Sequence, residues 1–306
     1  MTRNTRKVLA FILRVIGDKR RLFFWLSIRC LSAVFPLITI YQFSLVVRQL
    51  ESRSTLPTLL FTVFLLLLIR IVDNYLRLKS TTRLDNAISN IGFDIQNYFL
   101  TDLKSGTKEE RHSTVQAVRN FSDASTLTLS LFRQPGVDSL VSLLFIPAIL
   151  FTRDWTSFVL TVAYILVYYF IDLYTTQRYA HLKDILNTKT EAYYGKLQNS
   201  NDFDLEQRAW CRHFNRLCHW GFTEWFYLQN IAVVFYSSII LYLAYSVISG
   251  QKDLAELILI AGYVSQVQTH LNSFSQIQDS LTDMVVGLQH LAKNSHLSTI
   301  SLSDLV

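Results

Sequence analysis

The sequence has little of what builds turns and crosslinks. Its 306 residues include nine Gly, four Pro and three Cys, while half of all residues are hydrophobic. Few soluble domains have such a composition. The cysteines, Cys30, Cys211 and Cys218, are too few and too scattered to form a disulfide framework.

Motifs of soluble catalysis are also missing. No G-x-x-x-x-G-K-[ST] loop occurs, so the sequence offers no backbone cradle for the phosphates of ATP. Cys211, His213, Cys218 and His219 lack the spacing of a structural zinc site, and an aromatic-rich helix entering a membrane explains them better. With no nucleophile arrangement, metal site or cofactor site in view, we expect a protein that is not itself an enzyme.

What the sequence has is long apolar runs, and its mean hydropathy is +0.25. A membrane-spanning helix needs about 20 predominantly apolar residues to cross roughly 30 Å of hydrocarbon. Six segments fit this description, the first of them more polar than the rest: 23–47, 58–72, 140–151, 158–171, 231–248 and 254–264. The sequence therefore predicts an all-α integral membrane protein with six spans.

The net charge of +6 is concentrated ahead of the first span, which favours a membrane over nucleic acid as the partner. Basic residues that flank a span stay on the cytoplasmic side of the membrane. With six spans, both termini are then cytoplasmic, in what we expect to be a bacterial inner or plasma membrane. The cluster comprises Arg3, Arg6, Lys7, Arg14, Lys19, Arg20 and Arg21.

The helical pattern extends well beyond the apolar runs. From residue 58 it continues to about residue 103 without a proline, which predicts a helix of about 45 residues and about 70 Å. A polar tip, 104–111, then turns the chain back toward the membrane. Residues 155–249 repeat this hairpin around a second polar tip, 195–206. The sixth helix is expected to run from 253 to about 294.

The N-terminal segment 5–18 is predicted to be a basic amphipathic helix with an apolar face formed by Val8, Leu9, Phe11, Ile12 and Val15. Such a helix is expected to lie in the plane of the lipid headgroups. The predicted organisation is therefore an elbow helix over 1–22, a six-helix domain over 23–294 and a tail over 295–306.

This organisation resembles the transmembrane domain of ABC exporters over nearly the whole chain. Two local features are similar as well: Ile248-Ser249-Gly250 followed by Gly262-Tyr263 around the start of the sixth helix, and Asp123 early in the third helix. The resemblance implies a homodimer or heterodimer that forms a translocation pathway.

In most exporters a nucleotide-binding domain follows the sixth helix, and this sequence has none. We therefore expect a separate ATPase to dock on the two tips. The second tip lacks the apolar short helix that fits into the ATPase of exporters, which weakens this expectation. The tip residues predicted to contact the partner are Lys104, Gly106, Lys108, Glu109, Glu110 and Arg111, and Asn201, Asp202, Phe203 and Asp204.

Charged residues within spans are costly and normally face a partner or a cavity. Arg70 and Asp138 both lie about 20 Å from the outer boundary, and Asp73 is one turn below Arg70. We expect Arg70 to pair with Asp138 or with Asp73, as a structural lock or as the polar wall of a translocation cavity. The alternative is an intrahelical Arg70–Asp73 pair at i,i+3.

Two further features bear on mechanism. Pro135 and Gly136 interrupt the third predicted helix, and we expect a kink there that can serve as a hinge. Asp172 and Glu224 lie near the inner boundary, where we expect water and headgroups to solvate them.

Two other functions remain open at this point. One is a proton-coupled transporter of the same fold without an ATPase, with Asp138 as its titratable carboxylate. The other is a membrane scaffold or regulator that transports nothing.

Overall fold

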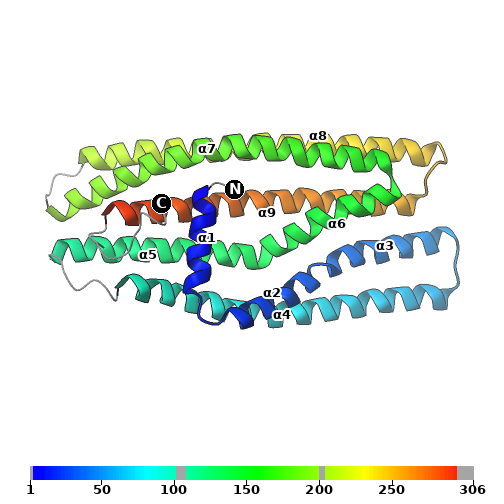
Figure 1. The fold of residues 1–306 in the computed structure, drawn as a ribbon. Coiled ribbons are helices and arrows are strands. Elements are labelled where there is room, and N and C mark those ends of the chain that lie inside the picture. The colour runs from blue at the N-terminus through cyan, green and yellow to red at the C-terminus, as the bar shows by residue number, and fades with distance from the viewer. Residues whose placement is uncertain (1–2, 101–107, 200–203, 295–306) are drawn as a thin grey trace. The chain divides into compact units, whose positions relative to one another are not determined.

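The computed structural model describes residues 3–100, 108–199 and 204–294, and within these ranges the chain is almost entirely helical and contains no strand (Figure 1). The all-α prediction is confirmed. In chain order the elements are α1 (Arg3–Val15), α2 (Lys19–Ser32), α3 (Phe35–Glu51), α4 (Leu56–Leu100), α5 (Lys108–Leu131), the π-helix η1 (Phe132–Gly136), α6 (Val137–Arg153), α7 (Trp155–Asn199), α8 (Asp204–Ile248) and α9 (Leu254–Asn294).

The chain forms two compact units. The first comprises residues 1–161 and 236–306, and the second comprises residues 162–235. Helices α7 and α8 each contribute to both units, because the unit boundaries fall inside these helices.

Five helical segments of the described chain are long and apolar enough to cross a membrane: Lys19–Glu51, Leu56–Leu100, Ala117–Arg153, Trp155–Thr190 and Asp204–Ile248. The predicted sixth helix forms as α9, but it is not among the five. Its apolar run covers only 254–264, and polar residues follow. The first segment is also not a single helix, because α2 ends at Ser32 and Pro36 lies in the first turn of α3.

The predicted helix lengths are confirmed. Helices α4, α7 and α8 have 45 residues each and α9 has 41. At 1.5 Å per residue these helices are roughly 60–70 Å long, about twice the thickness of the hydrocarbon layer. Helix α4 shows how one such helix divides: a series of exposed large apolar side chains runs from Leu56 to Leu78, and in the C-terminal part of the helix most apolar residues are buried, although Phe93 and Tyr98 are exposed.

Helix α1 packs against protein, which corrects the expectation that its apolar face lies among headgroups. Its side chains Val8, Phe11 and Ile12 are at most 4% exposed. In Figure 1, α1 runs across the long helices of the first unit. The apolar stripe of α1 packs there against apolar side chains of three other helices, and together they form a buried cluster. The contributing residues are Ile91, Ile95 and Phe99 of α4, Val118 and Phe121 of α5, and Met284, Leu288 and Leu291 of α9.

The second unit is held together by aromatic contacts between α7 and α8. The rings of Tyr164 and Phe235 lie 5.4 Å apart between centroids. The guanidinium group of Arg178 lies 4.4 Å from the centre of the Trp220 ring, in a cation–π contact.

Candidate functional site

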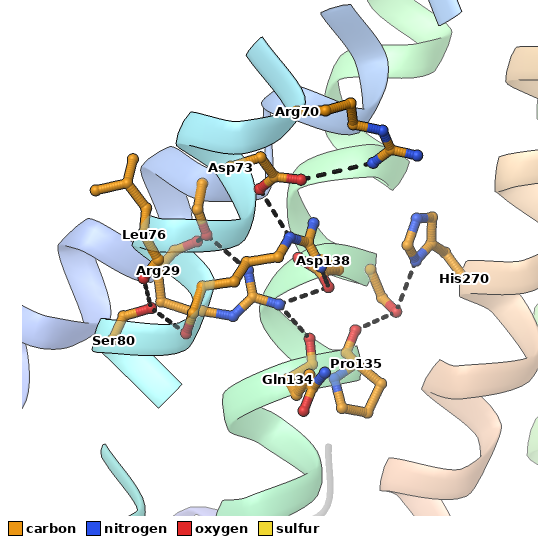
Figure 2. A network of polar contacts seen from close by, with 12 residues as sticks. Arg29, Arg70, Asp73, Leu76, Ser80, Gln134, Pro135, Asp138 and His270 are labelled. Carbon is orange, nitrogen blue, oxygen red and sulfur yellow. Dashed lines mark hydrogen bonds and ion pairs between the residues drawn. The ribbon is translucent and has the colours of Figure 1, made fainter. Parts of the chain in front are cut away.

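Four charged side chains from three helices form a continuous chain of ion pairs in the first unit (Figure 2). The Oδ2 atom of Asp138, in the first turn of α6, lies 2.6 Å from Nη2 of Arg29 in α2 and 3.3 Å from Nη1 of Arg77 in α4. The Nε of Arg77 also donates to Oδ1 of Asp73, at 2.8 Å. We call Arg29, Asp138, Arg77 and Asp73 the charge network.

The charge network is largely buried, with Arg77 its most exposed member at 26%. The Arg29 side chain is completely buried, and those of Asp73 and Asp138 are 1% and 14% exposed. Buried charges are tolerated only when other charges and hydrogen bonds compensate them. The two terminal nitrogens of Arg29 are compensated: they donate to Oγ of Ser32 at 2.8 Å and to the backbone carbonyl of Gln134 at 3.3 Å, in addition to the ion pair with Asp138, while Nε has no hydrogen-bond partner among the described residues.

The π-helix η1 positions Asp138. Pro135 has no N–H group to donate to a helical hydrogen bond, and residues Phe132–Gly136 form the wider turn of a π-helix instead of an α-helical one. A Cβ atom on Gly136 would lie 3.0 Å from Cδ1 of Ile277, so α9 packs closely against this turn. The kink predicted at Pro135 and Gly136 therefore falls in a π-helix, and its role as a hinge stays a prediction.

Helix α9 supplies a histidine beside the charge network. His270 is 8% exposed, and its Nδ1 atom lies 3.4 Å from the hydroxyl of Ser139, which itself donates to the carbonyl of Pro135 at 2.6 Å. Figure 2 shows this connection from α9 to η1 next to Asp138. Helices α2, α4, α6 and α9 therefore all contribute polar groups to one place.

The predicted partner of Arg70 is found within its own helix. Its Nη1 atom lies 3.7 Å from Oδ2 of Asp73, and its side chain is 50% exposed. Asp138 instead pairs with Arg29 and Arg77. The structure thus has the intrahelical alternative at Arg70, because the long side chain of residue 70 leaves α4 on its exposed face.

Sequence reasoning missed Arg29 and Arg77. Arg29 lies inside the first predicted span, where a charged residue requires a partner, and this signal was present. Arg77 follows Asp73 at i,i+4, a spacing at which helical side chains pair. The contact of both arginines with Asp138 joins residues 61 and 109 positions apart, and the sequence contains no local sign of it.

Arg77 contacts both carboxylates of the charge network, so a small movement can strengthen one ion pair at the expense of the other without leaving Arg77 uncompensated. With Arg70 included, the group has three guanidinium groups for two carboxylates, a formal excess of one positive charge. This arrangement can act as a switch of ion-pair partners or attract an anionic group.

A second polar cluster, which we call the loop clamp, joins the ends of α3, α6 and α8. The Nζ of Lys252 lies 2.9 Å from Oδ1 of Asp154 and 3.3 Å from Oε1 of Glu256, and the Tyr242 hydroxyl donates to Asp154 at 3.0 Å. Arg48 pairs with Asp253 at 3.0 Å.

The charges of the loop clamp change its pKa values in opposite directions. Burial acts to raise the pKa of Asp154, but hydrogen bonds from Ser157 and Lys252 outweigh it and lower that pKa below its ordinary value. Burial acts to lower the pKa of Lys252, and the carboxylates of Asp154 and Glu256 raise it overall. Both groups are therefore held in their charged forms.

Two carboxylates of the second unit are buried, against the expectation that they are solvated. Asp172 is 1% exposed and Glu224 is 6% exposed. The Thr175 hydroxyl donates a hydrogen bond to Glu224, and the indole of Trp220 donates to the backbone carbonyl of Thr175 at 3.3 Å. Packing of α7 on α8 encloses these side chains, which sequence depth alone does not reveal.

The predicted partner-docking tips fall mostly beyond what the structure describes. Lys104, Gly106, Asn201, Asp202 and Phe203 lie outside the described residues. Lys108, Glu109, Glu110 and Arg111 belong to the first turns of α5, where the backbone but not the side chains is described. Asp204 begins α8 and is exposed.

Within the described ranges, no group of three or more His, Cys, Asp or Glu side chains is placed to hold a metal ion. Compared by sequence, the chain matches no protein-family model and no curated protein.

Proposed function

We propose that this chain is the membrane-spanning subunit of an ABC-type transporter with exporter architecture. In this proposal two copies, or one copy and a related chain, form the translocation pathway, and a separate ATPase supplies the energy. The observation that supports it most is the length of α4, α7, α8 and α9, which at 41–45 residues exceed what a bilayer requires.

The packing of the first unit adds support. C-terminal to the exposed apolar stretch of α4, the helices α1, α4, α5 and α9 share one buried apolar cluster. A close-packed interior transmits displacement instead of absorbing it. This part of the molecule can therefore serve as a rigid stalk through which a partner moves the spans.

The charge network lies where movement of the stalk would change the positions of the membrane-spanning helices. It joins α2, α4 and α6 directly beside the π-helix η1, and π-turns inside α-helices are frequent at functional sites. In the proposed cycle the α5–α6 helix bends at Pro135 and Gly136, while Arg77 shifts between Asp73 and Asp138. Each conformation then retains compensated charges.

The ATPase-free alternative requires a carboxylate that gains and loses a proton. Asp138 suits this role poorly, because a proton there would remove the negative charge that Arg29 and Arg77 share. The buried pair Asp172 and Glu224 suits it better. Infrared difference spectroscopy on purified protein tests this: a protonated-carboxyl band that disappears in Glu224→Gln supports the proton-coupled alternative.

Affinity purification from native membranes tests the leading proposal. The full chain is isolated after mild crosslinking, and we expect a nucleotide-binding protein to co-purify and the complex to hydrolyse ATP. Charge reversal at the tips, Glu109→Lys together with Asp204→Lys, is expected to remove the ATPase. Charge reversal at the exposed Arg119 of α5, a matched control, is expected to retain it. Wild-type chain that yields no ATPase under these conditions contradicts the proposal.

A further inference from the structure

A cavity of about 290 Å³ lies where the turn between α1 and α2 meets the C-terminal half of α4. Its polar lining comprises two arginines, two aspartates and two asparagines: Arg21, Arg83, Asp18, Asp94, Asn86 and Asn90. On α4, the residues Arg83, Asn86, Asn90 and Asp94 follow one another at spacings of three or four, so they share one face of the helix. This cavity is separate from the charge network.

The exposed surfaces of two helices place this cavity at the edge of the apolar layer. On α4 an uninterrupted series of exposed large apolar side chains extends from Leu56 to Leu78, which is about 33 Å of helix and matches the hydrocarbon thickness; beyond it, Phe93 at the cavity and Tyr98 are the exposed large apolar side chains of this helix. Arg83 follows Leu78 by about 7 Å. On α2 the exposed large apolar residues begin at Phe23, two positions after Arg21. Both helices therefore change from apolar to basic at the cavity.

The four charged side chains lining the cavity do not pair with each other. In the part of the chain that the structure describes, Arg21, Arg83, Asp18 and Asp94 form no side-chain ion pair, and the Asp18 carboxylate accepts only the backbone N–H of Arg21. Their formal charges cancel. A ligand that complements them carries one negative and one positive group and has donors and acceptors for the asparagines.

We propose that this cavity binds the headgroup of a phosphoethanolamine lipid from the inner leaflet. The phosphodiester lies between Arg21 and Arg83, because guanidinium groups bind phosphate with paired hydrogen bonds. The primary ammonium group donates to Asp94. The acyl chains continue along the exposed apolar surfaces that begin at Phe23 of α2 and Leu78 of α4.

Native mass spectrometry of the purified full chain, with lipids added at equal concentration, tests this assignment. Phosphatidylcholine is the matched control lipid, since it keeps the phosphate but has no N–H on its amine, and phosphatidylglycerol keeps the phosphate but has no amine. We expect phosphatidylethanolamine to bind about tenfold more tightly than either, which corresponds to about 1.4 kcal/mol. Equal binding of the three lipids, or preference for phosphatidylglycerol, overturns the proposal.

Variants separate the two ends of the headgroup. Arg83→Gln is expected to weaken phosphatidylethanolamine and phosphatidylcholine equally, by about tenfold, because both lose a phosphate contact. Asp94→Asn is expected to abolish the preference for phosphatidylethanolamine over phosphatidylcholine. The control variants Arg119→Gln and Asp123→Asn, an exposed pair on α5, are expected to change neither. An Asp94→Asn protein that keeps the preference overturns the assignment.

A competition experiment identifies the source of the headgroup. Soluble phosphoethanolamine lacks acyl chains, so we expect it not to displace the lipid at the same concentration. Displacement as efficient as that by the lipid would make this a site for a soluble metabolite and would overturn the lipid proposal.

Discussion

Arg29 and Asp138 lie 109 residues apart in the chain, and their side chains meet at 2.6 Å in a site where Arg29 is completely buried. Removing one member of a buried ion pair leaves the other without compensation, at a cost of about 3–5 kcal/mol. We expect Arg29→Met to lower the thermal stability of the detergent-solubilised protein by this amount. The half-exposed Arg70, paired at 3.7 Å, is the matched control, and Arg70→Ala should cost less than about 1 kcal/mol. Similar losses from both variants would contradict the structure of the site.

Double-mutant cycles distinguish Arg70 from Arg77, two arginines of α4. Asp138→Asn and Arg70→Ala should have nearly additive effects on the free energy of unfolding, because these residues do not pair directly and are connected only through Asp73 and Arg77. Asp138→Asn and Arg77→Ala should deviate from additivity by about 0.5–3 kcal/mol, because Arg77 contacts Asp138 at 3.3 Å. Thermal unfolding followed by circular dichroism measures both cycles. The reverse outcome would reinstate the Arg70–Asp138 pair.

The position of α1 can be tested by truncating one ring. Phe11 is 4% exposed, and its ring centre lies 5.6 Å from that of Phe99. Phe11→Ala is therefore expected to cost about 3 kcal/mol or more, as for other buried aromatic residues. Leu13, on the same helix but 44% exposed, is the control, and Leu13→Ala should cost less than about 1 kcal/mol. Equal losses of stability in the two variants would indicate that α1 lies on the lipid surface instead.

The loop clamp makes stability depend on pH at both extremes. The pKa of Asp154 is lower in the folded protein, so its contribution is present above the ordinary pKa of about 4 and is lost as the pH falls through the folded value. The pKa of Lys252 is raised, so its contribution is complete below its ordinary pKa of about 10.4 and is lost as the pH rises through the folded value.

Between these extremes, the contributions of Asp154 and Lys252 to the melting temperature should therefore be nearly independent of pH. Asp154→Asn keeps a side-chain oxygen to accept from the Ser157 backbone N–H but removes the charge, and it should flatten the acid limb of the profile. Lys252→Met should flatten the alkaline limb. Asp253→Asn, which affects a more exposed pair, should leave both limbs in place. An unchanged acid limb in Asp154→Asn would exclude this role for Asp154.

The close contact of η1 with α9 predicts a size limit at residue 136. Gly136→Ala places a methyl group 3.0 Å from Cδ1 of Ile277 and should cost about 1–3 kcal/mol. Ile277→Val, combined with it, should recover part of this loss. Gly221 of α8 has no atom within 4 Å of the corresponding position, so Gly221→Ala should instead gain about 0.5–1 kcal/mol. A Gly136→Ala protein as stable as wild type would show that α9 does not pack there.

The elements of this fold could be predicted because their signals are local. The apolar run of α4 and the apolar residues that follow it at helical spacing predicted a helix over 58–103, and α4 covers Leu56–Leu100. Pro135 and Gly136 predicted the interruption that forms η1. These features depend on hydrophobicity and backbone chemistry within one segment.

The partners across helices could not be predicted in the same way. Whether Asp138 meets Arg70, Arg29 or Arg77 depends on the rotation of α2, α4 and α6 about their axes, and many rotations satisfy the same hydrophobic pattern. The same reason explains α1, whose apolar stripe suits lipid and protein equally well. Only the packed structure decides between them, by placing Phe99 and Phe121 beneath Phe11.

The wide turn at η1 also fixes the phase of everything that follows it. Each residue of an α-helix turns the chain by about 100°. A π-turn takes up one more residue than an α-helical turn. If Phe132–Gly136 wound as a regular α-helix with no residue removed, α6 would be rotated by roughly that angle, so that Asp138 would face away from Arg29 and Ser139 away from His270. The π-turn thus directs the carboxylate of Asp138 toward Arg29 and Arg77.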